Sequence, residues 1–269
     1  MKIFSIHSVL IISLLILGCS GDEKQKARDM IITRTMGFAY IDENKIPEAE
    51  NAIKQLIKIA PHEALGYANL GLVYIRMGNY QEAEVRLQEA LSIEPNDPEI
   101  QLNLAEVYIL TNRKREAIQL LEKTLNHHAD HIRTMYKLGQ TYSRSDTLAI
   151  RLKAEGLLKG VVEFLPANIT ARLDLVDILL RNDKAREALE YFEDLKQQIP
   201  EFPNEANQFY DHSISYMQQE MTNEAQSSFN IFRNIIKPTP LFRAGFDELT
   251  GMSGPLIGTP VVTFRKDIG

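Results

Sequence analysis

A period of 34 residues runs through this chain of 269 residues and constrains its fold more than any other feature. Tyrosines, alanines and prolines all recur at this spacing: Tyr40, Tyr74, Tyr108 and Tyr142; Ala49, Ala83 and Ala117; Pro61 and Pro95; Pro166 and Pro200. The alanines then continue at steps of 37, 34 and 37 residues, at Ala154, Ala188 and Ala225. Such a period is typical of stacked supersecondary units that bury their apolar faces against one another. We therefore expect a repeat array; a helical bundle with accidental periodicity is the alternative.

The clearest unit spans residues 64–97 and reads ALGYANLGLVYIRMGNYQEAEVRLQEALSIEPND. Leu70, Tyr74 and Ile75 share one helical face, which predicts that this face is buried against a second helix. Pro95 is expected to stop that second helix and to open the next unit. Each unit is therefore expected to be a hairpin of two helices.

Small residues mark the expected contact between the two helices of this unit. Gly71 and Ala83 lack bulk, so the two backbones can approach closely where these residues lie. Gly78 and Asn79 both tolerate positive φ, which predicts the turn between the helices.

The unit closely resembles a tetratricopeptide repeat (TPR) in Tyr67, Leu70, Gly71, Tyr74, Ala83, Leu87, Ala90 and Pro95. In that register six units occupy residues 30–63, 64–97, 98–131, 132–168, 169–205 and 206–239. Three extra residues in the fourth unit fall between Tyr142 and Ala154, where we expect the turn between its helices. The resemblance implies an all-α, right-handed superhelical solenoid of about six helix–turn–helix units.

The resemblance also implies that the first helices line a concave groove that holds a protein or peptide partner. The candidate partner-binding residues lie on the outward face of these helices: Arg34, Phe38, Leu72, Arg76, Asn103, Glu106, Arg133, Tyr136, Lys137, Gln140, Arg144, Asp177, Arg181 and Tyr210. Apolar residues interleaved with arginines suit a partner helix or an extended peptide with acidic side chains. The alternative for each apolar residue is packing against the next repeat.

Three of these residues match part of a further pattern. One TPR subclass clamps a partner's terminal carboxylate, and Asn103, Arg133 and Lys137 occupy matching places on two consecutive first helices. The preceding helix offers Ala68 and Leu72 where the pattern has Lys and Asn, so the resemblance implies an incomplete clamp.

The N-terminal residues are typical of a targeting segment. Lys2 precedes the apolar run 9–17, and this layout matches a secretory signal. The run is about half the ~20 residues that a membrane-spanning helix needs. Residues 16–19, Ile-Leu-Gly-Cys, resemble the bacterial lipobox, which implies cleavage before Cys19 and acylation of its thiol. A plain secretory signal and an incidental cysteine are the alternatives.

Cys19 is the only cysteine of the chain, so it cannot form an internal disulfide. Acylation gives it a use, because each buried methylene adds about 0.8 kcal/mol of membrane affinity. Ser20 rather than Asp follows the cysteine, a pattern that in such lipoproteins implies transfer to the outer membrane. We therefore expect a lipid-anchored protein of the bacterial cell envelope that faces the periplasm, with surface exposure as the alternative.

Charge and motifs narrow the function classes. Residues 1–18 carry Lys2 as their one charged residue, so the remaining chain has 29 basic and 36 acidic residues and a net charge of −7. This charge argues against nucleic-acid binding. The sequence has no Gly-rich phosphate loop, nucleophile elbow or His-Glu-x-x-His motif. We expect no catalysis, no cofactor and no small-molecule substrate.

One histidine cluster is a weak candidate for metal binding. His127, His128 and His131 lie within five residues of one another, and imidazole is the commonest nitrogen ligand of metals. The cluster falls between the third and fourth units, where exposed polar residues are expected in any case.

The sequence thus predicts a signal peptide (1–18), a polar tether (19–29), a TPR array (30–239) and a Gly/Pro-rich tail (240–269). The tail is expected to be irregular, with a short strand at 261–264, and to form either a cap or the stub of a further domain. The predicted function is a membrane-anchored scaffold for protein–protein interactions, such as assembly of a secretion or pilus complex. The alternatives are an adaptor for peptidoglycan enzymes and the N-terminal module of a larger sensory or substrate-binding protein.

Overall fold

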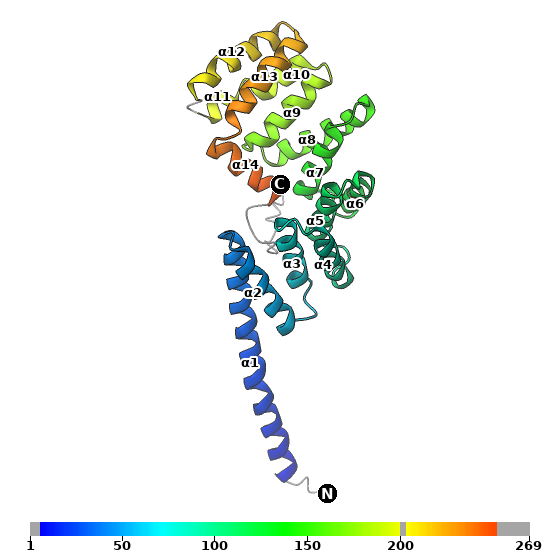
Figure 1. Ribbon diagram of the computed structural model, residues 1–269, viewed down its shortest axis with the longest axis vertical. Helices are drawn as coiled ribbons and strands as arrows, with labels where there is room; N and C mark the ends of the chain where they lie inside the picture. Colours follow the sequence, from blue (N-terminus) through cyan, green and yellow to red (C-terminus); the bar gives the residue numbers. More distant parts are fainter. Residues whose placement is uncertain (1–5, 200–202, 252–269) are drawn as a thin grey trace, which may run out of the picture. The chain divides into compact units, whose positions relative to one another are not determined.

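The computed structural model describes the backbone of residues 6–199 and 203–251, and their side chains except for residues 6–22 and 197–198. Every secondary-structure element in these ranges is a helix (Figure 1). The chain divides into two compact units, of which the first ends at Val107 and the second begins at Tyr108.

The first unit consists of helix hairpins. Its helices are α1 (Ile6–Asp42), α2 (Ile46–Ile59), α3 (Ala64–Arg76), α4 (Tyr80–Ile93) and the greater part of α5 (Pro98–Leu110). Helix α1 packs against α2, and α3 packs against α4. Helix α2 also packs against α3. This arrangement of alternating hairpins is the expected helical solenoid.

The N-terminal helix begins at Ile6, within the predicted signal segment, and runs without a break through the predicted tether. Helix α1 continues through Cys19, whose side chain lies outside the described residues. Within residues 6–199 and 203–251, no helix is both long enough and apolar enough to span a membrane.

The turns repeat with the same period as the sequence. Asn44, Gly78 and Asn112 each lie 34 residues apart, and each has a positive φ, of 56°, 74° and 60°. The predicted turn at Gly78 and Asn79 is confirmed, although only Gly78 takes the left-handed conformation, since Asn79 has a φ of −90°. A three-residue connection of this kind reverses the chain after each of the first helices α1, α3 and α5.

The small residues lie where the two helices of a hairpin meet. A Cβ atom on Gly71 would lie 2.7 Å from Cγ of Leu87 and 3.4 Å from the carbonyl oxygen of Ala83. Ala83 itself is fully buried. The expected close approach of α3 and α4 is therefore confirmed, and Gly71 is required because any side chain would push Leu87 aside.

The second unit is also built of helix hairpins. It holds α6 (Lys114–His127), α7 (Ile132–Ser143), α8 (Leu148–Phe164), α9 (Ile169–Arg181), α10 (Ala185–Phe192), α11 (Leu195–Gln198), α12 (Asn204–Gln218), α13 (Thr222–Ile236) and α14 (Pro240–Thr250). Three pairs of helices pack as hairpins: α7 with α8, α9 with α10, and α12 with α13.

The extra residues of the fourth unit lie only partly in the turn where the sequence predicts them. The turn between α7 and α8 comprises residues 144–147, one more than the turn between α3 and α4. Helix α8 has 17 residues, whereas α4 and α6 have 14 each. The insertion is thus shared between the turn and a longer second helix.

The last hairpin departs from the pattern of the earlier ones. Helix α12 packs against α10, and α13 returns to pack against α9. Between them lies an aromatic cluster: the ring centroid of Phe192 is 4.9 Å from Tyr210, 5.5 Å from Phe229 and 5.2 Å from Phe232. The rings fill the space between α10 and the last hairpin, whereas the places of Gly71 and Ala83 are taken there by the small, fully buried residues Ser213 and Ala225.

The expectation of an irregular tail is wrong for residues 240–250, which form helix α14. The hydroxyl oxygen of Thr239 accepts a hydrogen bond from the backbone N–H of Phe242 at 3.4 Å, and Pro240 occupies the first helical position. Gly251 ends the helix with a φ of 60°. Proline and glycine here start and stop a helix rather than prevent one. The predicted strand at 261–264 lies outside the described residues.

We predict that Ala83→Phe destabilises the protein by about 1–3 kcal/mol, because the ring has no room between α3 and α4. The matched control is Val85→Phe on the same helix, since Val85 is 40% exposed and its replacement leaves the hairpin interface intact. Chemical denaturation monitored by circular dichroism measures both variants. Equal stability of the two variants would contradict this assignment of the contact.

Candidate partner-binding surface

The predicted partner-binding residues of the second unit come from three helices. Arg133, Tyr136, Lys137 and Gln140 lie on α7, Asp177 and Arg181 lie at the middle and end of α9, and Tyr210 lies on α12. Arg144 follows α7 directly. We use "α7/α9 surface" for the face that carries Arg133, Tyr136 and Gln140 on α7, and Thr170, Asp174 and Asp177 on α9.

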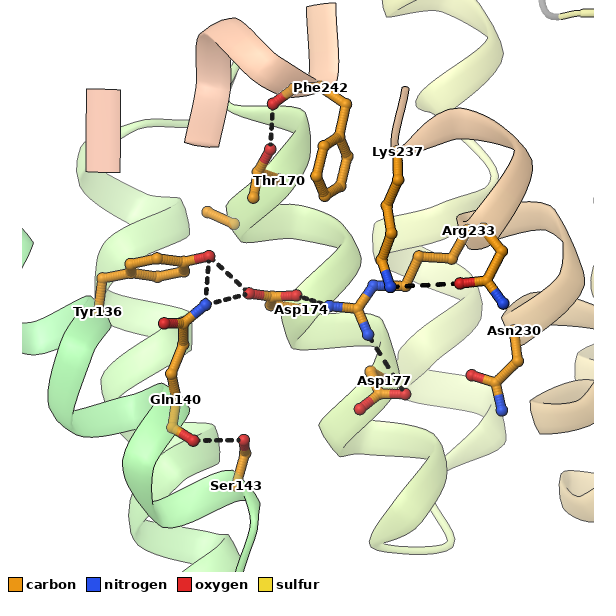
Figure 2. A network of polar contacts seen from close by, with 12 residues as sticks. Tyr136, Gln140, Ser143, Thr170, Asp174, Asp177, Asn230, Arg233, Lys237 and Phe242 are labelled. Atoms are coloured by element: carbon orange, nitrogen blue, oxygen red, sulfur yellow. Dashed lines mark hydrogen bonds and ion pairs between the residues drawn. The ribbon is translucent and has the colours of Figure 1, made fainter. Parts of the chain in front are cut away.

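A polar network joins α7, α9 and α13 at this surface (Figure 2). The carboxylate of Asp174 accepts a hydrogen bond of 2.7 Å from the hydroxyl of Tyr136 and one of 3.3 Å from the amide nitrogen of Gln140. The same amide nitrogen also donates to the Tyr136 hydroxyl oxygen at 2.7 Å. The other oxygen of Asp174 forms an ion pair with Arg233 of α13.

Burial determines the protonation of this network. Tyr136 is fully buried, and its burial, followed by the charge of Asp174, raises the pKa of its hydroxyl well above the ordinary value near 10. The phenol therefore remains protonated and donates to the carboxylate. Asp174 is 8% exposed, and a carboxylate at such a place is stabilised by pairing with the guanidinium of Arg233.

Helix α13 covers the middle of α9 through a second carboxylate. Asp177 accepts a hydrogen bond of 2.9 Å from the amide nitrogen of Gln226, and its oxygen lies 3.9 Å from Nη1 of Arg233. The predicted binding residue Asp177 is thus in contact with the chain's own last hairpin.

Helix α14 covers the N-terminal part of the same surface. The hydroxyl of Thr170 donates to the carbonyl oxygen of Phe242 at 2.8 Å (Figure 2). The amide nitrogen of Asn168 donates to the carbonyl oxygen of Gly245 at 3.0 Å, and Nη2 of Arg133 donates to that of Thr250 at 2.6 Å. Three donors of α7 and α9 therefore hold backbone carbonyls along α14.

The side chains of α14 that face α7 and α9 are large at both ends of the helix and absent in the middle. Phe242 and Leu249 are buried. A Cβ atom on Gly245 would lie 3.0 Å from Oδ1 of Asn168 and 3.1 Å from Oγ1 of Thr170. The helix backbone thus approaches α9 most closely at Gly245.

The remaining predicted residues of the second unit take different places. The expectation that Tyr210 lines a groove is wrong: it is 2% exposed, and its hydroxyl donates to the carbonyl oxygen of Glu193 at 2.6 Å. Burial raises the pKa of this hydroxyl to about 12. Tyr210 lies in the aromatic cluster because α12 packs against α10. Arg144 and Arg181 are exposed, and Arg181 donates to the carbonyl oxygen of Ser143.

In the first unit, several predicted residues contribute to packing. Leu72 and Asn103 are buried, and the amide nitrogen of Asn103 donates to the carbonyl oxygen of Glu99 on its own helix. Arg76 donates to the carbonyl oxygen of Ile41 at 2.7 Å, and burial lowers the pKa of its guanidinium.

Three further predicted residues of the first unit are half-buried: Arg34, Phe38 and Glu106. Arg34 forms an ion pair with Glu63. The structure does not support the predicted carboxylate clamp at Asn103. The side-chain amide nitrogen that Asn103 would offer a ligand already donates a hydrogen bond within α5.

The histidine cluster is not brought together as a set of metal ligands. Nδ1 of His127 lies 2.9 Å from the carbonyl oxygen of Lys123, whereas Nδ1 of the buried His131 lies 2.7 Å from Oγ1 of Thr134. Among the side chains that the structure describes, no group of three or more His, Cys, Asp or Glu residues is arranged to hold a metal ion.

Sequence reasoning missed the residues that hold α13 and α14, namely Asn168, Thr170, Asp174 and Arg233. One signal was available for Asp174, which lies directly between two leucines, Leu173 and Leu175, on α9. A charged residue in such a stretch is almost never buried unless it is paired. The identity of its partner, 59 residues away, had no local signal.

Comparisons with known proteins agree with this architecture. Two family models, both described as tetratricopeptide repeat, match residues 35–84 and 74–138. A search of curated proteins finds no match.

Solved structures of repeat proteins are similar to the chain. PilF of Pseudomonas aeruginosa is 14% identical with a TM-score of 0.62, and the match covers 83% of this chain and 99% of PilF. YrrB, described as a TPR protein with an unusual peptide-binding site, is 21% identical with a TM-score of 0.54 over 74% of this chain and 100% of YrrB. MamA of Desulfovibrio magneticus RS-1 is 19% identical with a TM-score of 0.53 over 64% of this chain and 96% of that one. At these identities the similarity shows the fold alone.

We predict that Asp174→Asn destabilises the protein by about 1.5–3 kcal/mol, because it removes the buried carboxylate that pairs with the half-buried guanidinium of Arg233. Asp177→Asn is the matched control: it keeps an oxygen for Gln226, and its 3.9 Å contact with Arg233 contributes less than about 1 kcal/mol. Urea denaturation gives both values. Both substitutions are then repeated in an Arg233→Met background. If Asp174→Asn and Asp177→Asn become equally destabilising there, the stability lost in Asp174→Asn comes from the ion pair with Arg233. If Asp174→Asn remains the more destabilising, the ion pair is not the cause.

Proposed function

Since the chain carries tetratricopeptide repeats, we propose that it is a membrane-anchored scaffold that binds protein partners in the bacterial cell envelope. The observation that supports binding most directly is the contact between the α7/α9 surface and helix α14. Arg133, Asn168 and Thr170 all donate to carbonyl oxygens of that helix, so this face of the array is already equipped to hold a polypeptide segment. The proposed role requires binding and no covalent chemistry.

The chemistry of the exposed rim suits an acidic partner. Arg144 and Arg181 lie at the C-terminal ends of α7 and α9 and are exposed. The acidic side chains nearby on α9, Asp174 and Asp177, are paired within the network and offer little charge to a ligand. The proposed partner is a protein whose binding segment carries acidic side chains toward this rim.

The proposed anchor is an acyl group on Cys19. The lipobox-like residues 16–19 and the absence of any other cysteine support this part of the proposal. Two or three acyl chains give firm attachment, since each buried methylene contributes about 0.8 kcal/mol. The location we propose is the outer membrane, with the array in the periplasm, where it recruits subunits of a secretion or pilus complex.

We predict that a photo-crosslinking amino acid placed at Arg181 captures discrete protein partners in living cells. The matched control is the same amino acid at Leu152 of α8, which is 43% exposed but belongs to a second helix. Adducts at position 181 and none of the same mass at position 152 are the expected result, read by immunoblot and mass spectrometry. Identical adducts at both positions, or none at position 181, would count against binding at this face.

We predict that Cys19→Ser abolishes incorporation of radiolabelled palmitate and moves the protein from the membrane fraction to the soluble fraction. The reason is that the hydroxyl does not replace the thiol as the acylated group. Ser20→Ala serves as the control and retains both label and membrane association. A wild-type protein that takes up no palmitate would refute the anchor while leaving the binding role untouched.

A further inference from the structure

Recognition of α14 by the array depends mainly on its backbone. The three donors that contact it, on Arg133, Asn168 and Thr170, all reach main-chain carbonyl oxygens, at Thr250, Gly245 and Phe242. Asn168 also donates to the carboxylate of Glu248 at 2.8 Å. Because backbone carbonyls are common to every helix, these contacts select a helix of suitable shape and do not require the sequence of α14.

The shape requirement is set at one position. Gly245 is where a Cβ atom would lie only 3.0 Å from Asn168 and 3.1 Å from Thr170. Phe242 and Leu249, three residues before and four residues after it, lie on the same helical face and are buried. The surface therefore accepts a helix with the pattern large–x–x–small–x–x–x–large.

The orientation of the helix is set by charge. Nη2 of Arg133 donates to the carbonyl oxygen of Thr250, the last residue of α14. The last four carbonyls of a helix lack partners within it, and the negative end of the helix dipole favours a cation there. A bound helix is thus expected to end at Arg133.

Asn168 is oriented for this contact by its own helix. Its Oδ1 atom accepts a hydrogen bond of 2.9 Å from the backbone N–H of Ala171 at the start of α9. The amide nitrogen is consequently directed at α14, and the donor is positioned by the repeat itself.

Helix α14 is short for an element that covers such a surface. It has 11 residues, and isolated helices shorter than about 12–15 residues are marginal in water. Leu241, Arg243 and Ala244 are exposed, so only part of the helix surface is held by α7 and α9.

We propose that the α7/α9 surface is a helix-binding site with α14 as its resident occupant, and that the partner supplies a helix of the same pattern that replaces α14 and ends at Arg133. The inference rests on the proposed function, because it names the kind of segment that the partner offers and the step that precedes its binding. The attachment of α14 to α13 through residues 237–239 gives it a high effective concentration at the site. A partner in solution consequently binds weakly until α14 is released.

The test uses the full chain and a fluorescein-labelled peptide of residues 238–251, PTPLFRAGFDELTG, as the probe. Gly245→Leu in the protein drives its own α14 off the surface without altering any residue of α7 or α9. The matched control is Ala244→Leu, which changes the neighbouring, exposed position of the same helix. Fluorescence anisotropy is expected to show at least 10-fold tighter peptide binding to Gly245→Leu than to the wild type, and wild-type affinity for Ala244→Leu.

A second variant tests the inference independently in case Gly245→Leu does not fold. In Gly251→Ala, the new Cβ atom would lie 1.9 Å from Nη2 of Arg133 at a residue with a φ of 60°, so α14 is loosened at its other end. Hydrogen exchange is expected to show unprotected amides in 240–250 and native protection in α7 and α9 for both variants. A peptide carrying Leu in place of Gly245 is expected not to bind.

The inference fails if α14 is released in either variant but the peptide still does not bind, or if α14 stays protected in Gly245→Leu. It also fails if sedimentation shows that the wild type is a dimer that exchanges α14 between copies. These outcomes are separable from the proposed function, because crosslinking at Arg181 reports partners whether or not α14 moves. If partners are crosslinked at position 181 but the peptide does not bind, the scaffold role stands and the replacement of α14 by a partner helix is rejected.

Discussion

The close contact between the two helices of each hairpin is the interaction on which the array depends. In the second repeat, Gly71 leaves room for Leu87, and the carbonyl oxygen of Ala83 lies 3.4 Å from where a Cβ on Gly71 would be. Helices that approach so closely exclude water from the residues between them, and a fully buried aliphatic side chain contributes about 1.5–3 kcal/mol. Because each hairpin presents a further apolar face, it is stable only when the next hairpin covers it.

The last hairpin is packed differently from the second repeat. Phe192, Tyr210, Phe229 and Phe232 form a cluster of rings between α10 and the last hairpin, and α13 also packs against α9. The ion pair of Asp174 with Arg233 secures this position. The face of α9 that was predicted from the sequence to bind a partner is consequently shared between α13 and α14. The residues expected to bind a partner therefore hold α13 and α14 of the chain itself.

Prediction from sequence succeeded where a residue's role is set by neighbours a few positions away. Gly71, Gly78 and Ala83 act within one hairpin, and their turn and contact were expected correctly. It failed where the partner is distant: Tyr210 was assigned to a groove, whereas its hydroxyl bonds to Glu193 in the preceding hairpin. Residues 240–250 were expected to be irregular because of their proline and glycines, although Thr239 and Gly251 cap a helix there.

The sequence by itself determined the repeat unit, its period and the positions of its turns, and it limited the insertion of the fourth unit to the interval between Tyr142 and Ala154. These follow from spacing, because a helix hairpin of given length returns each residue type to the same place. Only the tertiary structure decided what lies on the α7/α9 surface. Arg133 meets Thr250, and Asp174 meets Arg233, at separations of 117 and 59 residues. Such pairs carry no periodic signal, since they form only after the chain has folded back onto helices that were already stacked.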